Sequence, residues 1–467
     1  MGYGGYLTLL NGSPNDWTVS GTSSYQMDTW KWPTVKAGTS ERVYVEWGQK
    51  GSQKDDAGEA YYNIANTNGK FAVKGKKPSD FMLTITLDDH ATKQSPKGSK
   101  IDLGFRHDQS VHWLMSTDEA GDWWSNSGDT VDWMHQSLGS IGNRTLKQIC
   151  MPGSHDAGMS KFDAGTIGAT FANSQTQYLN IYDQLVAGSR YFDLRPVLSN
   201  GQWKAGHYSK VEGVGIGGNG LLISDVVKQV NDFTAKYKEL VIINVSHTFD
   251  TDNDYKDLTQ DQWNKLFDVL KGLNSRYTVK APGKTDFTTK VLDDFIKDTA
   301  SVFVVIQTPG GILLGDYADQ GFFGPDNFPF YDNYAESNNA DKMQKDQIAK
   351  LQSERNLVAD AAQRKDKFHI FSWTLTQAPE DVLNPEKAVM NLASSVYDAL
   401  FVEAFNAFTP EVFPNVLYVD ALGIRDKPIV FPYEKVQTVS TNYDIRHLAI
   451  AVNNAKAGRN AYITQTK

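Results

Sequence analysis

The chain has one cysteine, Cys150, among its 467 residues, so no intrachain disulfide can form. A single thiol is typical of a reducing compartment, but it also suits a large secreted protein whose core needs no covalent cross-link. Cys150 lies in an apolar run just before Pro152, where a buried and unreactive thiol is the expected state. The cysteine content therefore leaves the compartment open.

Long apolar runs are also missing, since no stretch approaches the roughly eighteen apolar residues that a membrane-spanning helix needs. Residues 1–7 contain neither a basic segment nor a long apolar one, and Tyr6 replaces the Ser or Thr of a myristoylation motif. We therefore expect no signal peptide and no transmembrane segment. The expected protein is soluble, either cytoplasmic or non-classically secreted, with at most peripheral contact with a membrane.

An excess of basic residues is absent as well, because 46 Lys and Arg accompany 55 Asp and Glu, for a formal net charge of −9. Binding to a nucleic-acid backbone depends on clustered Lys and Arg, so nucleic acid is excluded as the main partner. What the chain does have is ordinary globular composition with 12% aromatic residues, enough for a sizeable core. Its length predicts two or three domains.

The first part of the chain, residues 1–118, alternates apolar and polar positions in short runs such as 42–47 and 81–87, punctuated by turn residues. This pattern predicts an antiparallel all-β sandwich, with lipid or glycan binding as its candidate role. Residues 119–142 follow as a polar stretch rich in tryptophan. We interpret this stretch as a packed linker, because exposed tryptophan is costly in water.

From residue 143 to 467, strand-like runs alternate with segments of helical period, which predicts a parallel sheet and a distorted (β/α)8, or TIM, barrel. Residues 277–287 are the candidate for a missing strand. Ser224 and Thr259 are predicted N-caps. The strand-like runs are 147–151, 190–195, 203–208, 240–246, 302–306, 369–375 and 416–420, and the helical segments are 224–238, 259–273, 341–355 and 388–408.

Titratable side chains follow several of these runs directly. In a barrel of this type, catalytic groups lie at the C-terminal ends of the strands, and the last strand neighbours the first. The side chains are therefore expected to converge on one rim, where they could accept a proton, return one and bind an anion. The candidate catalytic residues are His155, Asp156, Asp193, Arg195, His207 and Asp420.

Over roughly residues 133 to 425, these segments resemble the X-domain of phosphatidylinositol-specific phospholipases C, within the superfamily of phospholipase C-like phosphodiesterases. The resemblance implies a distorted TIM barrel, lipid metabolism as the context and cleavage of the phosphodiester of a phospholipid headgroup. That reaction is a phosphoric diester hydrolase or phosphorus–oxygen lyase activity. The segments that carry it are 152–156, 184–195, His207, 239–244, 371–376 and 419–420.

Carried over by position, the resemblance implies that His155 is the general base that activates a hydroxyl of the substrate. Asp420 would orient and charge-stabilise this imidazole. His207 would protonate the leaving alkoxide, held protonated by Asp156. One departure is that the family usually has His-Gly at the third strand, whereas this chain has Gly206-His207.

The resemblance also implies a phosphate clamp and a metal-independent site. Arg195 would bind the phosphate oxygens, and Asp193 would fix its guanidinium. The alternative is that Asp193 and Arg195 form only a structural ion pair inside the barrel. Animal relatives hold calcium through an Asn at the position of Asp156 and through carboxylates at the positions that here carry Asp193, Arg195 and Ser246. A fixed guanidinium would repel calcium, so no metal and no other cofactor is expected, as in bacterial members.

Other candidates have two interpretations. Trp373 either stacks on a ring of the substrate or belongs to the core, and Tyr208 and Lys204 are further candidate substrate-binding residues. His247 is either an extra acid or base or a neutral part of the scaffold. The alternative functions are cleavage of another phosphodiester, such as a glycerophosphodiester or a lysophospholipid, and lipid or glycan binding by a protein with an inactive barrel.

Overall fold

The computed structural model describes residues 3–77, 80–211, 214–307, 310–358, 362–381, 384–430, 435–436 and 439–457. The chain divides into two compact units, which are described separately. The predicted domains 1–118 and 143–467, with a linker at 119–142, follow the order of the sequence, whereas each unit gathers distant segments. The first unit comprises the described residues of Met1–Thr130, Tyr397–Phe413 and His447–Lys467, and the second those of Val131–Val396 and Pro414–Arg446.

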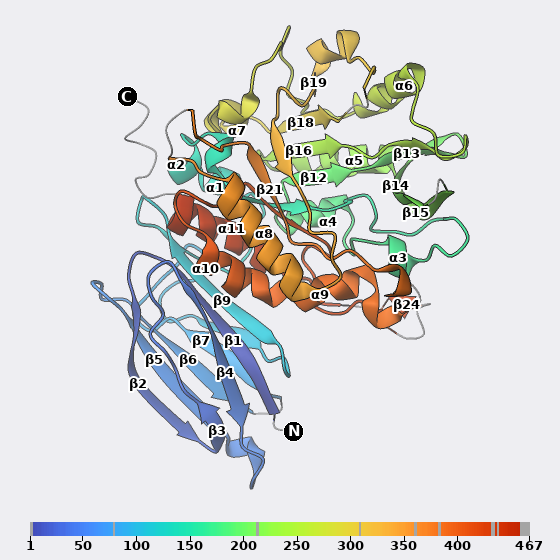
Figure 1. The fold of residues 1–467 in the computed structure, drawn as a ribbon. Coiled ribbons are helices and arrows are strands. Elements are labelled where there is room, and N and C mark those ends of the chain that lie inside the picture. The colour runs from blue at the N-terminus through green and yellow to red at the C-terminus, as the bar shows by residue number, and fades with distance from the viewer. Residues whose placement is uncertain are drawn as a thin grey trace. The chain divides into compact units, whose positions relative to one another are not determined.

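Two five-stranded sheets form most of the first unit (Figure 1). One has the order β10-β9-β1-β4-β3, and the other has the order β2-β5-β6-β7-β8. The expectation of purely antiparallel pairing is wrong at one place, because β1 and β9 run parallel, with Leu7 opposite Val111. The strands are β1 (Tyr3–Gly12), β2 (Trp17–Tyr25), β3 (Met27–Trp30), β4 (Ser40–Trp47), β5 (Ala57–Ile64), β6 (Lys70–Lys76), β7 (Met82–Thr86), β8 (Lys100–Gly104), β9 (Ser110–Thr117) and β10 (Trp123–Ser125).

Side chains from both sheets belong to one cluster of buried residues, which includes Leu9 and Trp113 from the first sheet and Tyr62 and Val73 from the second. Alternating apolar residues produce this arrangement, since every second side chain of a strand points to the same face. β10 lies inside the segment that was interpreted as a linker, and it pairs with β9. Trp123 and its neighbours are therefore part of a sheet.

Strand β9 is buried along its whole length, so both of its faces are covered. One face meets the shared core. On the other, His112 stacks on Phe401 with ring centroids 4.2 Å apart and bonds to Asp398 at 3.0 Å. Residues from the last part of the chain thus complete the first unit, which sequence order alone did not predict.

The second unit is built on an eight-stranded sheet in which every pair is parallel. Its order, β19-β18-β16-β12-β11-β22-β21-β20, follows the chain around a ring that is open between β19 and β20. Parallel order with helical crossovers is the arrangement predicted from the alternation of runs. The strands are β11 (Met151–Ser154), β12 (Tyr191–Leu194), β16 (Leu240–Val245), β18 (Ser301–Ile306), β19 (Phe322–Phe323), β20 (Phe330–Asp332), β21 (Phe368–Ser372) and β22 (Val416–Val419).

Two strand predictions are wrong. Run 203–208 is not the third strand of the parallel sheet. It lies in β14 (Gln202–Val211), which pairs antiparallel with β13 (Pro196–Ser199) and β15 (Val214–Leu222) in a four-stranded sheet completed by β17 (Phe249–Asp250). Residues 277–287 form no strand, and the short β19 and β20 supply the remaining positions. Periodicity does not separate a parallel strand from an antiparallel one, and strands of two or three residues carry no pattern.

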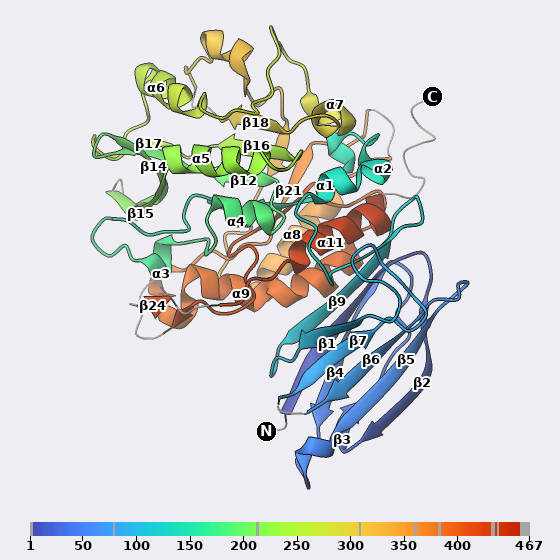
Figure 2. The same ribbon diagram turned by 180° about the vertical axis from the view of Figure 1, so that it is seen from behind.

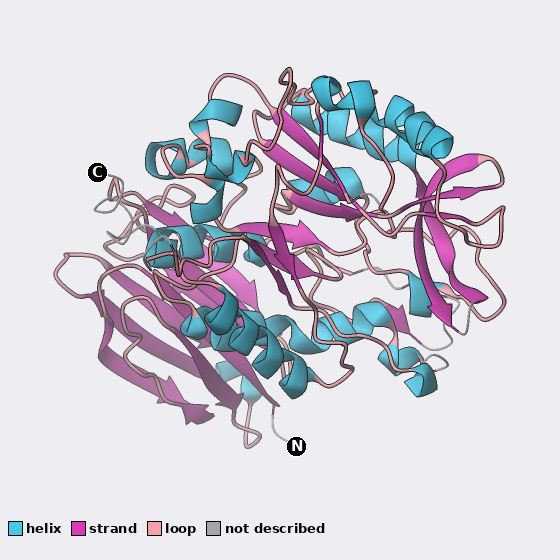
Figure 3. Cartoon of the chain, turned by 45° about the horizontal axis from the view of Figure 1, so that its top comes forward, coloured by secondary structure: helices cyan, strands magenta, loops and turns pink. Residues whose placement is uncertain are grey.

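Helices lie along the parallel sheet, as Figure 2 shows for α4 and α5 beside β12 and β16, and Figure 3 distinguishes the helices from the strands by colour. The apolar residues of α5 recur at helical spacing, from Ile223 to Phe233, and pack with Ile243 of β16. The longer helices are α4 (Ile181–Val186), α5 (Ile223–Thr234), α6 (Gln260–Leu270), α8 (Ala340–Glu354), α9 (Val389–Ala399) and α11 (Asp444–Val452); the shorter ones are α1 (Trp133–Gln136), α2 (Leu138–Ile141), α3 (Phe171–Ser174), α7 (Asp293–Ile296) and α10 (Phe405–Ala407).

Of the two predicted N-caps, Thr259 is confirmed and Ser224 is wrong. Thr259 caps α6 and forms a capping box with Gln262, as predicted. Ser224 is not the cap of α5, because that helix already begins at Ile223 after Leu222. Cys150 is fully buried and forms no disulfide, which confirms the interpretation of its apolar run. In the part of the chain that the structure describes, no helix combines the length and apolarity needed to cross a membrane.

Candidate active site

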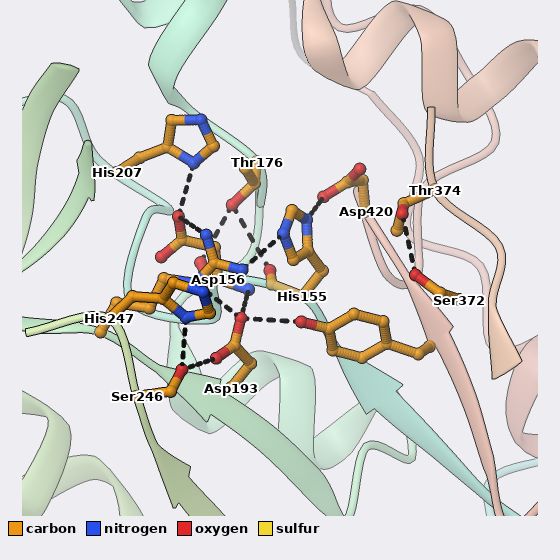
Figure 4. Close-up of polar contacts among 12 residues, drawn as sticks. His155, Asp156, Thr176, Asp193, His207, Ser246, His247, Ser372, Thr374 and Asp420 are labelled. Atoms are coloured by element: carbon orange, nitrogen blue, oxygen red, sulfur yellow. Dashed lines mark hydrogen bonds and ion pairs between the residues drawn. The ribbon is translucent and has the colours of Figure 1, made fainter. Parts of the chain in front are cut away.

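The first histidine of the site directly follows β11, and its carboxylate partner directly follows β22. These strands pair in parallel, with Ser154 opposite Val419, so the next residues, His155 and Asp420, leave the sheet side by side. His155 Nδ1 lies 2.6 Å from Asp420 Oδ1 (Figure 4). Gln177 holds both turns, because its Nε2 donates to the backbone oxygens of His155 and Val419. The predicted adjacency of the first and last strands is confirmed.

The second histidine, His207, comes from β14 rather than from the parallel sheet. Its Nδ1 lies 2.6 Å from Asp156 Oδ2, as Figure 4 shows. Asp156 has a positive φ of 42°, an unusual conformation for a non-glycine residue, and it turns its carboxylate from the end of β11 toward His207. Thr176 stabilises this turn by donating to the backbone oxygen of Asp156 at 2.9 Å. The second pair thus joins two different sheets.

Arg195 lies between the two pairs. Its Nε donates to Asp193 Oδ2 at 2.8 Å, its Nη2 lies 3.0 Å from His155 Nε2, and its Nη1 lies 3.7 Å from Asp156 Oδ2. Burial disfavours a charged guanidinium, but the negative charges of Asp193 and Asp156 outweigh that effect and raise the pKa of Arg195 well above its usual range. The guanidinium is therefore a fixed positive charge.

Asp193 anchors this guanidinium with a carboxylate that accepts four hydrogen bonds. Burial alone would raise the pKa of Asp193, but the charge of Arg195 more than offsets it and holds that pKa far below the usual range, with a further contribution from His155 when that ring is protonated. The carboxylate is therefore ionised. Its donors are Arg195 Nε at 2.8 Å, the Asp156 backbone N–H at 3.1 Å, Tyr418 OH at 2.7 Å and Ser246 Oγ at 2.9 Å.

Two of these donors were not predicted. Tyr418 lies inside the apolar run of β22, where an aromatic residue looks like any other core side chain in the sequence. Ser246 was noted only as the counterpart of a calcium ligand. No local motif marks either residue, because each acquires its role from the carboxylate of Asp193 on a neighbouring strand.

The protonation of His155 follows from its surroundings. Burial lowers the pKa of the imidazole, but the charge of Asp420 and its hydrogen bond raise it more, so the pKa lies above the usual value. In the arrangement observed, the Nη2 of Arg195 donates to His155 Nε2. Only the neutral imidazole, with its proton on Nδ1 toward Asp420, offers a lone pair there.

The two imidazoles face a common space. Their ring centroids are 6.4 Å apart and their planes are inclined by 83°. The side chains of His155 and His207 retain 17% and 25% exposure, whereas those of Asp420 and Asp156 retain 2% and 0%. The rings therefore reach solvent while the carboxylates behind them are buried. Two imidazoles, each backed by a buried carboxylate, and a fixed cation are thus presented together.

The predicted substrate-binding residues are placed differently. Trp373 is 2% exposed, stacks on Phe371 with centroids 5.1 Å apart and donates to the backbone oxygen of Val396, so the indole has the core role rather than a free face. Lys204 is committed to Asp163, 2.6 Å away, rather than to a free anion site.

Tyr208, next to His207 in β14, is half-buried. Its hydroxyl donates to Asn219 Oδ1 at 2.8 Å, which ties β14 to β15. The ring lies 5.4 Å from that of Tyr255. Binding of substrate by Tyr208 stays a prediction. In the described part of the chain, no group of three or more His, Cys, Asp or Glu is placed to hold a metal ion.

Comparisons with known proteins were made for the sequence and for the structure. No family model and no curated protein matches the sequence. A phosphatidylinositol-specific phospholipase C of S. aureus is 16% identical, with a TM-score of 0.46 over 69% of this chain and 97% of that one. The enzyme of the same name from Listeria monocytogenes is 16% identical, with a TM-score of 0.41 over 70% of this chain and 99% of that one.

A third solved structure, the lipid-binding protein Nakanori, matches 24% of this chain and 69% of its own at 12% identity and a TM-score of 0.19. The chain is thus similar, at low sequence identity, to bacterial phosphatidylinositol-specific phospholipases C, the family that its motifs resemble.

Proposed function

We propose that the protein is a phosphodiesterase that cleaves the headgroup phosphodiester of a phospholipid by general acid–base catalysis. The observation that supports this most is the convergence of His155–Asp420 and His207–Asp156, each 2.6 Å apart, around the guanidinium of Arg195. Two histidines backed by buried carboxylates can serve as base and acid in one step.

In the first step, a hydroxyl of the headgroup attacks the neighbouring phosphorus. Its proton passes to His155 Nε2, the atom that now accepts from Arg195. His207 gives its Nε2 proton to the lipid oxygen as the P–O bond to that oxygen breaks. The products are a cyclic phosphodiester and an alcohol, and hydrolysis of the cyclic ester follows with the two histidines in exchanged roles.

Arg195 is proposed to bind the non-bridging phosphate oxygens and to stabilise the charge that develops there. Asp193 holds the guanidinium through Nε, which leaves both terminal nitrogens directed toward His155 and Asp156. A cation in this position can act where relatives use calcium. We therefore propose that the reaction needs no metal, and that a chelator leaves the activity intact.

The proposed architecture assigns the eight-stranded sheet to a distorted (β/α)8 barrel that is open between β19 and β20. The two sheets of the first unit are assigned to a sandwich, because they share one core. The boundaries 1–118, 119–142 and 143–467 stay predictions, as does binding of lipid or glycan by the sandwich.

Peripheral contact with a membrane is supported by two exposed isoleucines, Ile167 in the loop between β11 and α3 and Ile216 in β15, the strand that pairs with the one carrying His207. Ile167 is 103% exposed and Ile216 is 43% exposed. The antiparallel bridge between Gly165 and Gly218, and the hydrogen bond from the Thr166 N–H to the Gly217 oxygen, bring this loop alongside β15. Exposed apolar side chains are unfavourable in water, and a lipid interface would cover them.

The proposal is tested with the purified full chain on vesicles of phosphatidylinositol or phosphatidylcholine, with and without EDTA. We expect cleavage of phosphatidylinositol, insensitivity to EDTA, and loss of activity in His155→Ala and His207→Ala. His107→Ala, a substitution in the first unit, is the matched control. Unchanged activity in His155→Ala contradicts the mechanism and favours a binding protein with an inactive barrel, and loss of activity in EDTA contradicts the metal-free site.

A further inference from the structure

A short buried segment, residues 175–177, is bonded to both catalytic turns but belongs to no helix or strand. It directly follows α3, and the side chains of Gln175, Thr176 and Gln177 are all buried. One catalytic turn follows β11 and begins at His155, and the other follows β22 and begins at Asp420. We call residues 175–177 the clasp, because their hydrogen bonds join these two turns.

The turn after β22 is held by two bonds to the clasp. The Ala421 N–H donates to the backbone oxygen of Thr176 at 2.8 Å. The Leu422 N–H donates to Gln177 Oε1 at 3.0 Å. Together these bonds fix the backbone directly after Asp420.

The turn after β11 is held by two side chains of the clasp. Gln177 Nε2 donates to the backbone oxygen of His155 at 2.8 Å and to that of Val419 at 3.1 Å. Thr176 Oγ1 lies 2.9 Å from the backbone oxygen of Asp156 and 3.4 Å from that of His155, as Figure 4 shows. Gln177 therefore joins the two turns, whereas the Thr176 hydroxyl serves the turn after β11 alone.

Both turns contain a residue in the left-handed region, where a side chain is disfavoured. Asp156 has a φ of 42° and Ala421 has a φ of 47°. Such a conformation persists only where the surrounding structure holds it. The clasp bonds directly to the oxygen of Asp156 and to the N–H of Ala421. Rotation of either residue toward an ordinary φ would move the carboxylate of Asp156 or of Asp420 away from its histidine.

We propose that Gln177 and Thr176 are positioning residues for the proposed phosphodiesterase reaction, a function on which this inference rests. Gln177 sets the contact between Asp420 and His155. Thr176 sets the direction of the Asp156 carboxylate. Both clasp side chains are 0% exposed, so they act on the substrate only through these groups.

Gln177→Met keeps the length of the side chain and removes its three hydrogen bonds. Burial lowers the pKa of His155, but the charge of Asp420 and its hydrogen bond raise that pKa above the usual value. A displaced Asp420 therefore lowers the pKa of His155 and misdirects the imidazole. The other charged or titratable groups near His155 are not altered by this substitution: Asp193, Arg195, His207, His247, Asp332 and Tyr418.

Two measurements on the full chain follow the His155 pair. The first is an NMR titration of the His155 ring signal, which is identified by its absence from His155→Ala. The second is the pH dependence of kcat and KM on vesicles of phosphatidylinositol. We expect Gln177→Met to lower the midpoint of the His155 titration and to reduce kcat about tenfold to a hundredfold at unchanged KM.

Gln347→Met is the matched control, because Gln347 is also a buried glutamine that joins two backbone segments. Its Nε2 donates to the Asn333 oxygen at 2.9 Å, and its Oε1 accepts from the Ser372 N–H at 3.0 Å. Neither bond involves a catalytic turn. Gln347→Met should lower stability in urea unfolding as Gln177→Met does, and should keep the wild-type kcat and His155 midpoint.

Thr176→Val removes the hydroxyl with little change of shape. We expect kcat to fall about tenfold, with KM and the His155 midpoint unchanged, because the bond to Asp156 is lost. Thr176→Ser keeps a hydroxyl and should restore most of this loss. The two variants decide the inference if Gln177→Met fails to fold, since equal kcat in Thr176→Val and Thr176→Ser overturns it.

A glycine tests the left-handed turn. Glycine adopts positive φ without strain, so Ala421→Gly should relieve the turn that the clasp holds. We expect the double variant Gln177→Met/Ala421→Gly to recover part of the kcat and part of the His155 midpoint that Gln177→Met loses. A double variant no better than Gln177→Met contradicts the role of this turn.

The inference and the proposed function fail in different ways. A wild-type His155 midpoint in Gln177→Met overturns the inference, whether kcat is unchanged or falls only as far as in Gln347→Met. Failure of the wild-type protein to cleave phosphatidylinositol contradicts the proposed function instead. The NMR titration does not depend on catalysis, so it still decides whether Gln177 sets the pair.

Discussion

His155 Nδ1 and Asp420 Oδ1 lie 2.6 Å apart although 265 positions separate the two residues in the chain. The parallel pairing of the first and last strands of the sheet brings them together. The carboxylate is 2% exposed and the imidazole keeps 17% exposure, so Asp420 can both orient the ring and affect its protonation while one edge of the ring still reaches solvent.

Replacing Asp420 by Asn tests that pairing. Burial lowers the pKa of His155, but the charge of Asp420 and its hydrogen bond raise that pKa above the usual value. The base therefore loses its proton only at a pH above about 6.5. We expect Asp420→Asn to move the acidic limb of kcat/KM to lower pH and to reduce the plateau on the order of 10⁴-fold, as replacement of the orienting carboxylate does in a catalytic triad. The measurement is a pH–rate profile, with Asp261→Asn on α6 as control. A limb that stays in place contradicts the role of Asp420.

The same substitution changes stability in a defined pH range. A raised pKa means that the folded protein holds the His155 proton more tightly than the unfolded chain does. Stabilisation by the charged pair is therefore complete below the unfolded pKa of about 6.5 and is lost as pH rises through the folded pKa. Urea unfolding should show the destabilisation by Asp420→Asn shrinking with rising pH. A constant difference would refute the charge pairing.

Tyr418 is predicted to position Arg195 through Asp193. Tyr418→Phe removes the hydroxyl that donates to Asp193 Oδ2 at 2.7 Å, which should cost about 1 kcal/mol of unfolding free energy. It should also lower kcat/KM, because the anchor of the guanidinium is weakened. Tyr62→Phe is the matched control, since Tyr62 is also buried and donates to the Pro33 oxygen. Equal loss of stability without loss of activity would assign Tyr418 a structural role only.

The buried pair Arg190–Glu239 is predicted to be a folding determinant. Arg190 Nε lies 2.7 Å from Glu239 Oε2, and both side chains are 0% exposed. Arg190→Met leaves a buried carboxylate without its partner and should cost about 3–5 kcal/mol in urea unfolding. The double variant Arg190→Met/Glu239→Gln should cost less than the sum of the single ones. Lys265→Met, which breaks an exposed pair with Asp261, should cost under about 1 kcal/mol.

His369 is predicted to destabilise the protein in acid. Its ring is fully buried, and neither nitrogen has a hydrogen-bond partner among the residues that the structure describes. Burial, aided by the charge of Arg355, lowers the pKa of His369 to about 3. The unfolded chain binds this proton near pH 6.5 and the folded one does not, so stability falls as pH drops through that interval.

Phe at position 369 keeps the stacking on Tyr331, whose ring centroid is 4.8 Å away, and removes the titration. His369→Phe should therefore gain stability over the wild type progressively between about pH 6 and 4. Urea unfolding at several pH values measures this, with His107→Phe as control. A pH-independent difference contradicts the assignment.

Ile167 and Ile216 are predicted to contact lipid. Replacing both by Asp places charge where the proposed interface requires apolar surface, so co-sedimentation with phosphatidylinositol vesicles should fall at least about tenfold. Activity on a soluble phosphodiester should persist, because neither residue belongs to the catalytic groups. Leu313→Asp, at another apolar residue that is 71% exposed, is the control. Undiminished sedimentation of the double variant would exclude this contact.

Much of the site could be predicted because the informative residues stand directly after buried runs. The ends of parallel strands meet at one edge, so His155, Asp193 and Asp420 could be grouped from their places in the sequence. His207 does lie with these residues, but it does not come from the end of a parallel strand as expected. It belongs to β14, a strand of the antiparallel sheet. There the family resemblance compensated for a wrong strand assignment.

By itself, the sequence determined the alternation of strands and helices in the second unit, the β-strand character of residues 1–118 and the set of acid–base residues. The spacing of hydrophobic residues and the residue types are local properties, so they can be recognised in the sequence without knowledge of the tertiary structure. Only the tertiary structure decided that residues 397–413 complete the first unit, that Trp373 is core, and that Tyr418 and Ser246 bind Asp193. Those contacts join segments far apart in the chain, and no local pattern encodes which distant partner a buried polar atom will meet.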